Sequence, residues 1–173
     1  ALLGAAPPVP LVYVDRWPEP GKVAAVTTAN AEAAAALVDH LAAAGCDGLI
    51  LDMTTVNGVQ RERRAGALAA ARRLGWPSRR KARHPGILAN DQSGAERCLA
   101  RGIQPRAIAV FDAWIGDPWP AGRAFVAIQD FATMARTAVE VLVQAIASGA
   151  SPAPGLRRIP LKGIETALSR VGV

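Results

Sequence analysis

Four short apolar runs of this 173-residue chain end in polar side chains whose types could hold a small molecule. A carboxylate at the end of a buried strand loses hydration, so we expect it there only where a charged or hydroxylated group meets it. The four spots are Asp15-Arg16, Thr54-Thr55, Asn90-Asp91 and Asp112. Because ligands gather at the carboxyl ends of strands in alternating α/β folds, these spots are placed to line one cleft.

Asp91 and Arg63 carry the chemistry best suited to such a cleft. Neutral hydroxylated ligands are held by planar groups, where a carboxylate accepts hydrogen bonds and a guanidinium donates them. Each residue also has a purely structural explanation: Asp91 would cap a helix that begins at Gln92, and Arg63 would be one of several solvated arginines. The residue types alone leave these alternatives open.

The sequence lacks the common catalytic templates GxxxxGK[ST], GxGxxG, HExxH and paired CxxC. Ser93 follows an apolar run and opens a helix as an esterase nucleophile would, with His40 or His84 as its base. The surrounding DQSGA differs from GxSxG, however, because Asp91 replaces the glycine that the strained turn needs. We therefore expect a binding protein rather than an enzyme, with no cofactor and no metal.

Composition and charge place the chain among soluble globular proteins, with 51% hydrophobic and 20% charged residues. No apolar stretch reaches the ~18 to 20 residues that cross a bilayer, and the first residues lack a basic leader. Cys46 and Cys98 match no metal spacing and are predicted to be buried thiols. Nine of the 20 Lys and Arg residues lie between Arg61 and Arg83, which indicates either a nucleic-acid surface or, as we favour, a solvated helix face.

Alternating strands and helices are predicted along most of the chain. Apolar runs that are continuous rather than alternating indicate strands covered on both faces, as in parallel sheets. These runs are residues 11–14, 48–53, 86–89, 107–111 and 125–128. Helices are predicted from Asn30, as a cap, to Gly45, over residues 60–74, from Gln92, and from Asp130, as a cap, to Gly149. This order indicates an α/β fold.

Six segments, in this order, resemble the effector-binding region of lactose- and galactose-repressor-type bacterial transcription regulators. They are PLVYVDR, VTTANAEAAAALVDHLAAAG, QRERRAGALAAARRLG, ILANDQSGA, IAVFDAW and AIQDFATMARTAVEVLVQAI. Their order, together with the NDQ and RxxG motifs, carries the resemblance. It implies the type I periplasmic-binding-protein-like fold, in which two Rossmann-like lobes with parallel sheets flanked by helices are joined by several crossovers and hold an effector between them.

The resemblance assigns residues 1–42 and 125–148 to the first lobe and residues 43–124 and 149–173 to the second. Arg63 matches the arginine of the RxxG motif and Asp91 the aspartate of the ND motif, and both line the effector cleft in the family. Thr55, Asn57 and Asp112 fall on loops that face the same cleft.

The chain departs from the family pattern in several places. Ala29 stands where the family has an aspartate before the first helix, which removes one effector contact. Only ten residues, from Trp76 to Pro85, separate the second helix from the next strand, where the family inserts another strand and helix. The helix-turn-helix that would bind operator DNA is missing. The resemblance therefore implies an incomplete two-lobe domain.

These features predict the effector-sensing and dimerisation part of a cytoplasmic transcriptional regulator. It binds a small metabolite, a sugar or a related compound, between its lobes and forms a homodimer through the first lobe. It would reach operator DNA only through a missing N-terminal domain, and no membrane partner is expected. The alternative is a solute-binding protein of a sugar uptake system, which would share the fold and the cleft.

Overall fold

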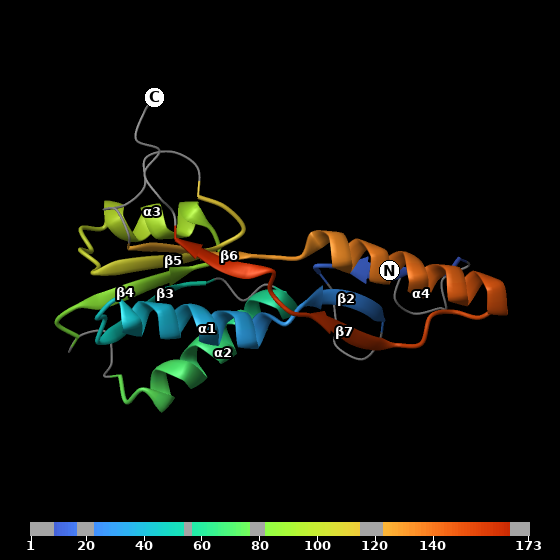
Figure 1. Ribbon diagram of the computed structural model, residues 1–173, viewed down its shortest axis with the longest axis horizontal. Helices are drawn as coiled ribbons and strands as arrows, with labels where there is room; N and C mark the ends of the chain where they lie inside the picture. Colours follow the sequence, from blue (N-terminus) through green and yellow to red (C-terminus); the bar gives the residue numbers. More distant parts are fainter. Residues whose placement is uncertain (1–8, 17–22, 54–56, 77–81, 115–122, 167–173) are drawn as a thin grey trace, which may run out of the picture.

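Two sheets lie side by side along the long axis of the molecule (Figure 1). The computed structural model describes residues 9–16, 23–53, 57–76, 82–114 and 123–166. Its elements are β1 (Val12–Val14), β2 (Ala24–Thr28), α1 (Asn30–Ala43), β3 (Gly48–Asp52), α2 (Gly58–Arg73), β4 (Pro85–Ala89), α3 (Gln92–Ala100), β5 (Ala107–Phe111), β6 (Ala124–Ile128), α4 (Phe131–Ser148), β7 (Gly155–Ile159) and β8 (Gly163–Thr166). None of these helices is long and apolar enough to span a membrane.

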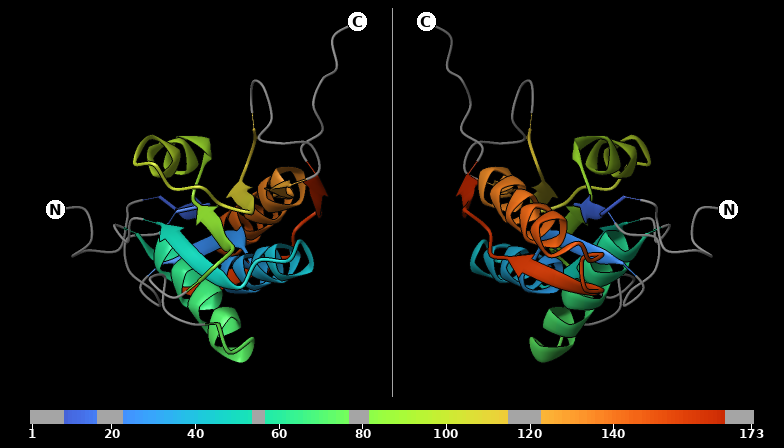
Figure 2. Two further views of the ribbon diagram at one scale, coloured as in Figure 1. Left: turned by 90° about the vertical axis from the view of Figure 1, so that its left-hand side faces the viewer. Right: turned by 90° about the vertical axis from the view of Figure 1, so that its right-hand side faces the viewer.

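The larger sheet has the strand order β3-β4-β5-β6-β8, and only β8 runs antiparallel to its neighbour. α1 and α2 cover one face, and α3 covers the other (Figures 1 and 2). Successive residues of β5 belong to opposite cores: Phe111 packs with α1 and α2, whereas Val110 packs with α3. The prediction of parallel strands buried on both faces is confirmed. β3 pairs directly with β4, so this sheet is continuous without the family's inserted strand.

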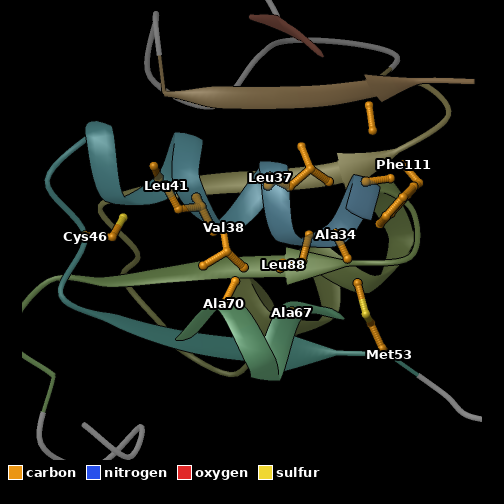
Figure 3. Packing of buried hydrophobic residues seen from close by; sticks show 14 residues of the cluster. Ala34, Leu37, Val38, Leu41, Cys46, Met53, Ala67, Ala70, Leu88 and Phe111 are labelled. Carbon is orange, nitrogen blue, oxygen red and sulfur yellow. The ribbon is translucent and has the colours of Figure 1, made fainter. Parts of the chain in front are cut away.

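The main core lies between the larger sheet and the helices α1 and α2 (Figure 3). Leu37, Val38 and Leu41 of α1 are fully buried against Leu88 of β4 and Phe111 of β5. The predicted apolar face of this helix is therefore confirmed. Burial of one such side chain contributes about 1.5–3 kcal/mol.

The smaller sheet consists of β1, β2 and β7 in that order, all parallel. α4 covers one face, where Met134 and Ala138 pack against Val26. α4 begins after the predicted cap Asp130, whose side chain accepts the Thr133 N–H, and ends at Gly149 with a positive φ of 64°. Val59 at the start of α2 packs against Ala25 of the smaller sheet, so α2 contacts both sheets.

The sheets do not divide at the predicted lobe boundaries. α1 packs on the larger sheet although residues 1–42 are assigned to the first lobe, and β6 also belongs to the larger sheet. β7 joins the smaller sheet, although residues 149–173 are assigned to the second lobe. β7 pairs with β2 along the whole of residues 24–28, and this pairing places it in the smaller sheet. β2 and β7 are also strands that the apolar runs do not predict.

The described chain crosses between the sheets three times: after β2, after β6 and after β7. These crossovers lie side by side and are hydrogen-bonded. Ala29 N–H donates to the Ile159 carbonyl at 2.8 Å, and Lys162 N–H donates to the Ile128 carbonyl at 2.9 Å. The several crossovers implied by the family resemblance are therefore present.

α1 and α2 approach each other closely at Gly66. A Cβ atom at this position would lie 2.1 Å from the backbone carbonyl oxygen of Ala31. Backbone atoms cannot rotate away as a side chain can, so the glycine is required by space. Gly66 is the glycine of the RxxG motif, and Arg63 lies one turn before it.

We expect Gly66→Ala to lower the free energy of unfolding by about 1–3 kcal/mol, the usual cost of forcing extra atoms into a packed interior. Alanine normally stabilises a helix interior by roughly 0.5–1 kcal/mol relative to glycine, so the sign of the effect is diagnostic. Urea denaturation measures it. Ala69→Gly, on the exposed face of the same helix, is the matched control for helix propensity alone. A stabilised Gly66→Ala protein would contradict the close packing.

Candidate functional site

Arg63 is the only charged side chain that is buried among the described residues, with 5% of its surface exposed. Its Nε atom donates a hydrogen bond to Oδ1 of Asn30 at 2.9 Å. Its guanidinium carbon lies 3.8 Å from the ring centroid of Phe111, in a cation–π contact. The alternative that Arg63 is one of several solvated arginines is therefore wrong.

Asn30 is also fully buried, and it holds Arg63 instead of capping a helix. The prediction that Asn30 caps α1 is wrong, because the helix begins at Asn30 and its N-cap residue is Ala29, with no side-chain cap. The Asn30 amide nitrogen donates to Thr27 Oγ1 at 3.0 Å and to the Thr28 carbonyl at 2.8 Å. These bonds fix the amide so that its oxygen faces the guanidinium.

Three carboxylates interact electrostatically with Arg63, namely those of Asp112, Asp15 and Asp91. Burial lowers the pKa of Arg63, and the three carboxylates oppose this shift. They follow β5, β1 and β4 in the chain, so they come from the carboxyl ends of strands in both sheets. Three of the four polar spots found in the sequence thus contribute to one electrostatic cluster.

The Asp15 carboxylate is incompletely hydrogen-bonded within the described residues. Its Oδ1 atom is buried and has no hydrogen-bond partner in the described parts of the chain. Burial raises the pKa of Asp15, Asp112 raises it further, and Arg63 and Arg16 lower it. Its backbone has a positive φ of 59°, which aspartate tolerates better than most residues. A buried acceptor of this kind would be satisfied by a hydrogen-bond donor from water or from a ligand.

Asp112 is connected to the crossovers through a chain of side-chain hydrogen bonds. Gln129, which follows β6 and is buried, donates its amide to Asp112 Oδ1. Thr28, at the end of β2, donates its hydroxyl to the Gln129 amide oxygen. A carboxylate at the end of the larger sheet is therefore linked to the last residue of a strand in the smaller sheet.

The remaining predicted site residues have simpler roles. Asp91 is exposed and caps α3, since its Oδ1 accepts the Gly94 N–H at 2.8 Å, so the capping explanation is confirmed. Asn57 caps α2 by accepting the Gln60 N–H at 3.0 Å. Thr55 lies outside the described residues. Asn90, next to Asp91, has a buried side-chain oxygen without a described partner.

Asn30, Phe111 and Gln129 contact Arg63 or Asp112 and are not among the predicted site residues, whereas Asp15 and Asn90 were predicted only as parts of the polar spots at strand ends. Asp15 and Asn90 carry a signal in the sequence, because both end apolar runs. Gln129 also follows an apolar run directly. Asn30 and Phe111 carry no such signal, because an asparagine at a helix start normally indicates a cap and a phenylalanine in an apolar run normally indicates core.

The fold does not bring together the residues of the esterase alternative, Ser93 with His40 or His84. Ser93 is exposed on the first turn of α3, after β4, whereas His84 precedes the same strand. His40 lies on α1, across the sheet from α3, with its Nδ1 2.9 Å from the Ala36 carbonyl and its ring against Phe125. No group of metal ligands occurs among the described residues.

Two arginines of the basic segment between Arg61 and Arg83 make contacts within the protein. Arg63 is buried, and Arg73 forms an ion pair with Asp39 at 2.6 Å.

A cavity of about 380 Å³ lies between α4 and the beginnings of β2 and β7, lined by residues that include Ala24, Ser148 and Gly155. It is at the opposite end of the strands from the polar cluster. Cys46 and Cys98 are free and buried, as predicted.

The two sheets, their crossovers and their order of elements define the α/β fold of type I periplasmic-binding-protein-like domains. This is the fold of the effector-binding region of lactose-repressor-type regulators, so the predicted fold is confirmed. No protein-family model matches the sequence, and no curated protein matches it.

Three solved structures illustrate the similarity. A periplasmic binding protein/LacI transcriptional regulator from Alkaliphilus metalliredigens, complexed with D-xylulofuranose, has a TM-score of 0.70 at 17% identity over 94% of this chain and 71% of its own. The Cra regulator from Pseudomonas putida, in complex with fructose 1-phosphate, has a TM-score of 0.68 at 17% identity. The similarity covers 92% of this chain and 69% of that protein. The Lac repressor bound to ONPG has a TM-score of 0.67 at 15% identity. The similarity covers 92% of this chain and 56% of that protein. At these identities the likeness concerns the fold.

The raised pKa of Asp15 leads to a prediction about pH and stability. The folded state binds the Asp15 proton more tightly than the unfolded state, so stability is lost as pH rises from the unfolded pKa through the folded pKa. We expect Asp15→Asn to melt at a higher temperature than the wild type at about pH 7 and at the same temperature at about pH 3. Thermal melts across this range measure the difference.

Asp39→Asn serves as the control for this experiment, because Asp39 is an exposed partner of Arg73 and such pairs contribute little. An Asp15→Asn protein that is less stable than the wild type at neutral pH would show that the Asp15 carboxylate is satisfied in the folded state.

Proposed function

We propose that this chain is the effector-sensing part of a cytoplasmic transcriptional regulator, and that a small metabolite binds between its two sheets. The observation that supports this best is the buried Arg63, which is held by Asn30 and whose charge interacts with those of Asp15, Asp91 and Asp112. A buried guanidinium with carboxylates from several strand ends is suited to a ligand with many hydroxyl groups. Sugars are such ligands, and solved structures of this fold hold D-xylulofuranose and fructose 1-phosphate.

The crossovers supply a route by which binding would be transmitted. Asp112, Gln129 and Thr28 connect the cluster to both sheets. A ligand that contacts Asp15 from the smaller sheet and Asp112 from the larger one would favour one angle between the sheets. A change of angle follows only when the ligand has different affinities for the two arrangements. We place operator binding in an N-terminal helix-turn-helix domain outside this chain, as in the family that it resembles.

A thermal-shift screen against sugars, nucleosides and amino acids tests the proposed site. We expect a ligand to raise the melting temperature by roughly 5–10 °C at about a hundred times its Kd. Asp112→Ala should abolish the shift. Asp91→Ser should weaken it while keeping the cap of α3, because serine also caps helices well. Asp39→Ala, on the exposed face of α1, is the matched control.

A ligand whose shift survives both Asp112→Ala and Asp91→Ser binds elsewhere, and the cavity between α4 and the smaller sheet would then be the site to test next. A well-folded protein that no member of the panel stabilises would contradict the proposed function.

We also propose that the chain forms a homodimer through the smaller sheet and α4. Val139, Val143 and Ile146 lie on one face of α4 and are 58%, 58% and 66% exposed. Val9, Leu11 and Val14, in and before β1, are exposed as well. Apolar patches of this kind typically mark surfaces that another protein covers.

Sedimentation velocity tests the homodimer. We expect a dimer at about 10 μM, and we expect Val143→Glu to give a monomer, because a charge in the centre of an apolar interface stays unpaired. Gln144→Glu adds the same charge beside it on the exposed surface of α4 and should remain dimeric. A wild-type monomer at this concentration would rule out the interface.

A further inference from the structure

Two buried side-chain atoms at the proposed site have no described hydrogen-bond partner, and both are oxygens. Oδ1 of Asp15 and Oδ1 of Asn90 are both buried without a described partner, and they follow β1 and β4. Acceptors of this kind require donors from the ligand. A hydroxyl group can donate, whereas a phosphate group at neutral pH presents acceptor oxygens and negative charge. This inference rests on the proposed function, because it concerns the ligand of that same site.

Arg63 is partly engaged within the protein, and its charge is already opposed by carboxylates. One edge of its guanidinium donates to Asn30, and its face lies against Phe111. Three carboxylates already interact with its charge, so a ligand phosphate would meet more negative than positive charge around it. Arg16 and Arg97 lie nearby but are exposed, and Arg97 is paired with Asp52 at 3.2 Å.

The helix starts near the cluster offer no phosphate cradle. Exposed N–H groups at the start of a helix commonly bind phosphate. In α3 this position is occupied by the carboxylate of Asp91, and in α2 by the amide oxygen of Asn57. α1 has no side-chain cap, but its first turn carries Glu32.

We propose that the site binds an uncharged, hydroxyl-rich ligand, such as a free sugar or a nucleoside, and rejects the phosphate ester of the same compound. Asp15 and Asp112 are the residues that determine this specificity. They present acceptor oxygens to ligand hydroxyls from opposite sheets, and they repel a second negative charge.

Matched pairs of compounds test the proposal. The probes are fructose and fructose 1-phosphate, ribose and ribose 5-phosphate, galactose and galactose 1-phosphate, and adenosine and its monophosphate. Titration calorimetry at constant ionic strength gives a Kd for each. For any pair that binds, we expect the ester to bind at least about tenfold more weakly than the free compound, since like charges placed together are strongly unfavourable. Inorganic phosphate should give no more stabilisation than chloride at the same ionic strength.

The variants Asp15→Asn and Asp112→Asn should reduce this ratio, because each removes a charge and keeps an oxygen acceptor. Asp39→Asn, which is remote from the site, should leave the ratio unchanged. An ester that binds as tightly as its free partner would overturn the charge preference and leave the proposed function standing. A ratio unchanged in both Asn variants would overturn the role of the two aspartates. Absence of binding by every probe would overturn the proposed function and this inference with it.

Discussion

The hydrogen bond between Arg63 and Asn30 is the constraint around which the structure is arranged. A guanidinium remains charged at any pH of interest, so its burial is tolerated only if neighbouring groups replace the lost water. Asn30 can accept this bond only because Thr27 and Thr28 hold its amide in place. Phe111 supplies the ring on the other side. The starts of α1 and α2 and the end of β5 must therefore meet at one point.

The packing of α1 against α2 follows from the same requirement. Arg63 reaches Asn30 because the two helices nearly touch, and they can do so because Gly66 has no side chain where the Ala31 carbonyl lies. Alanines continue this contact along both helices, and Ala34, Ala67 and Ala70 are all buried in it. Small residues thus determine the distance between the helices, while the polar pair at their beginning determines their register.

The elements could be predicted from the sequence much more completely than the contacts between them. Strands buried on both faces leave continuous apolar runs, which is why β3 to β6 were expected nearly where they lie. β2 contains two threonines and β7 contains Arg157 and Arg158, so neither has such a run. Arg63, Asp91 and Asp112 were identified as candidates because they belong to motifs or end strands. The hydrogen-bond partners of Arg63 and Asp112 were not, because Asn30 lies 33 positions from Arg63 and Gln129 lies 17 positions from Asp112.

The pairing of β2 with β7 has a consequence for how the chain folds during synthesis. β3, β4 and β5 each pair with the next strand in the sequence, so the four strands from β3 to β6 can assemble in order as they leave the ribosome. β2 is made before all of them, yet it waits for β7 to be completed at Ile159. The smaller sheet is therefore completed only after the strands from β3 to β6 have been made. A nascent chain released before that residue would expose an unpaired edge of β2, and edges of this kind promote aggregation.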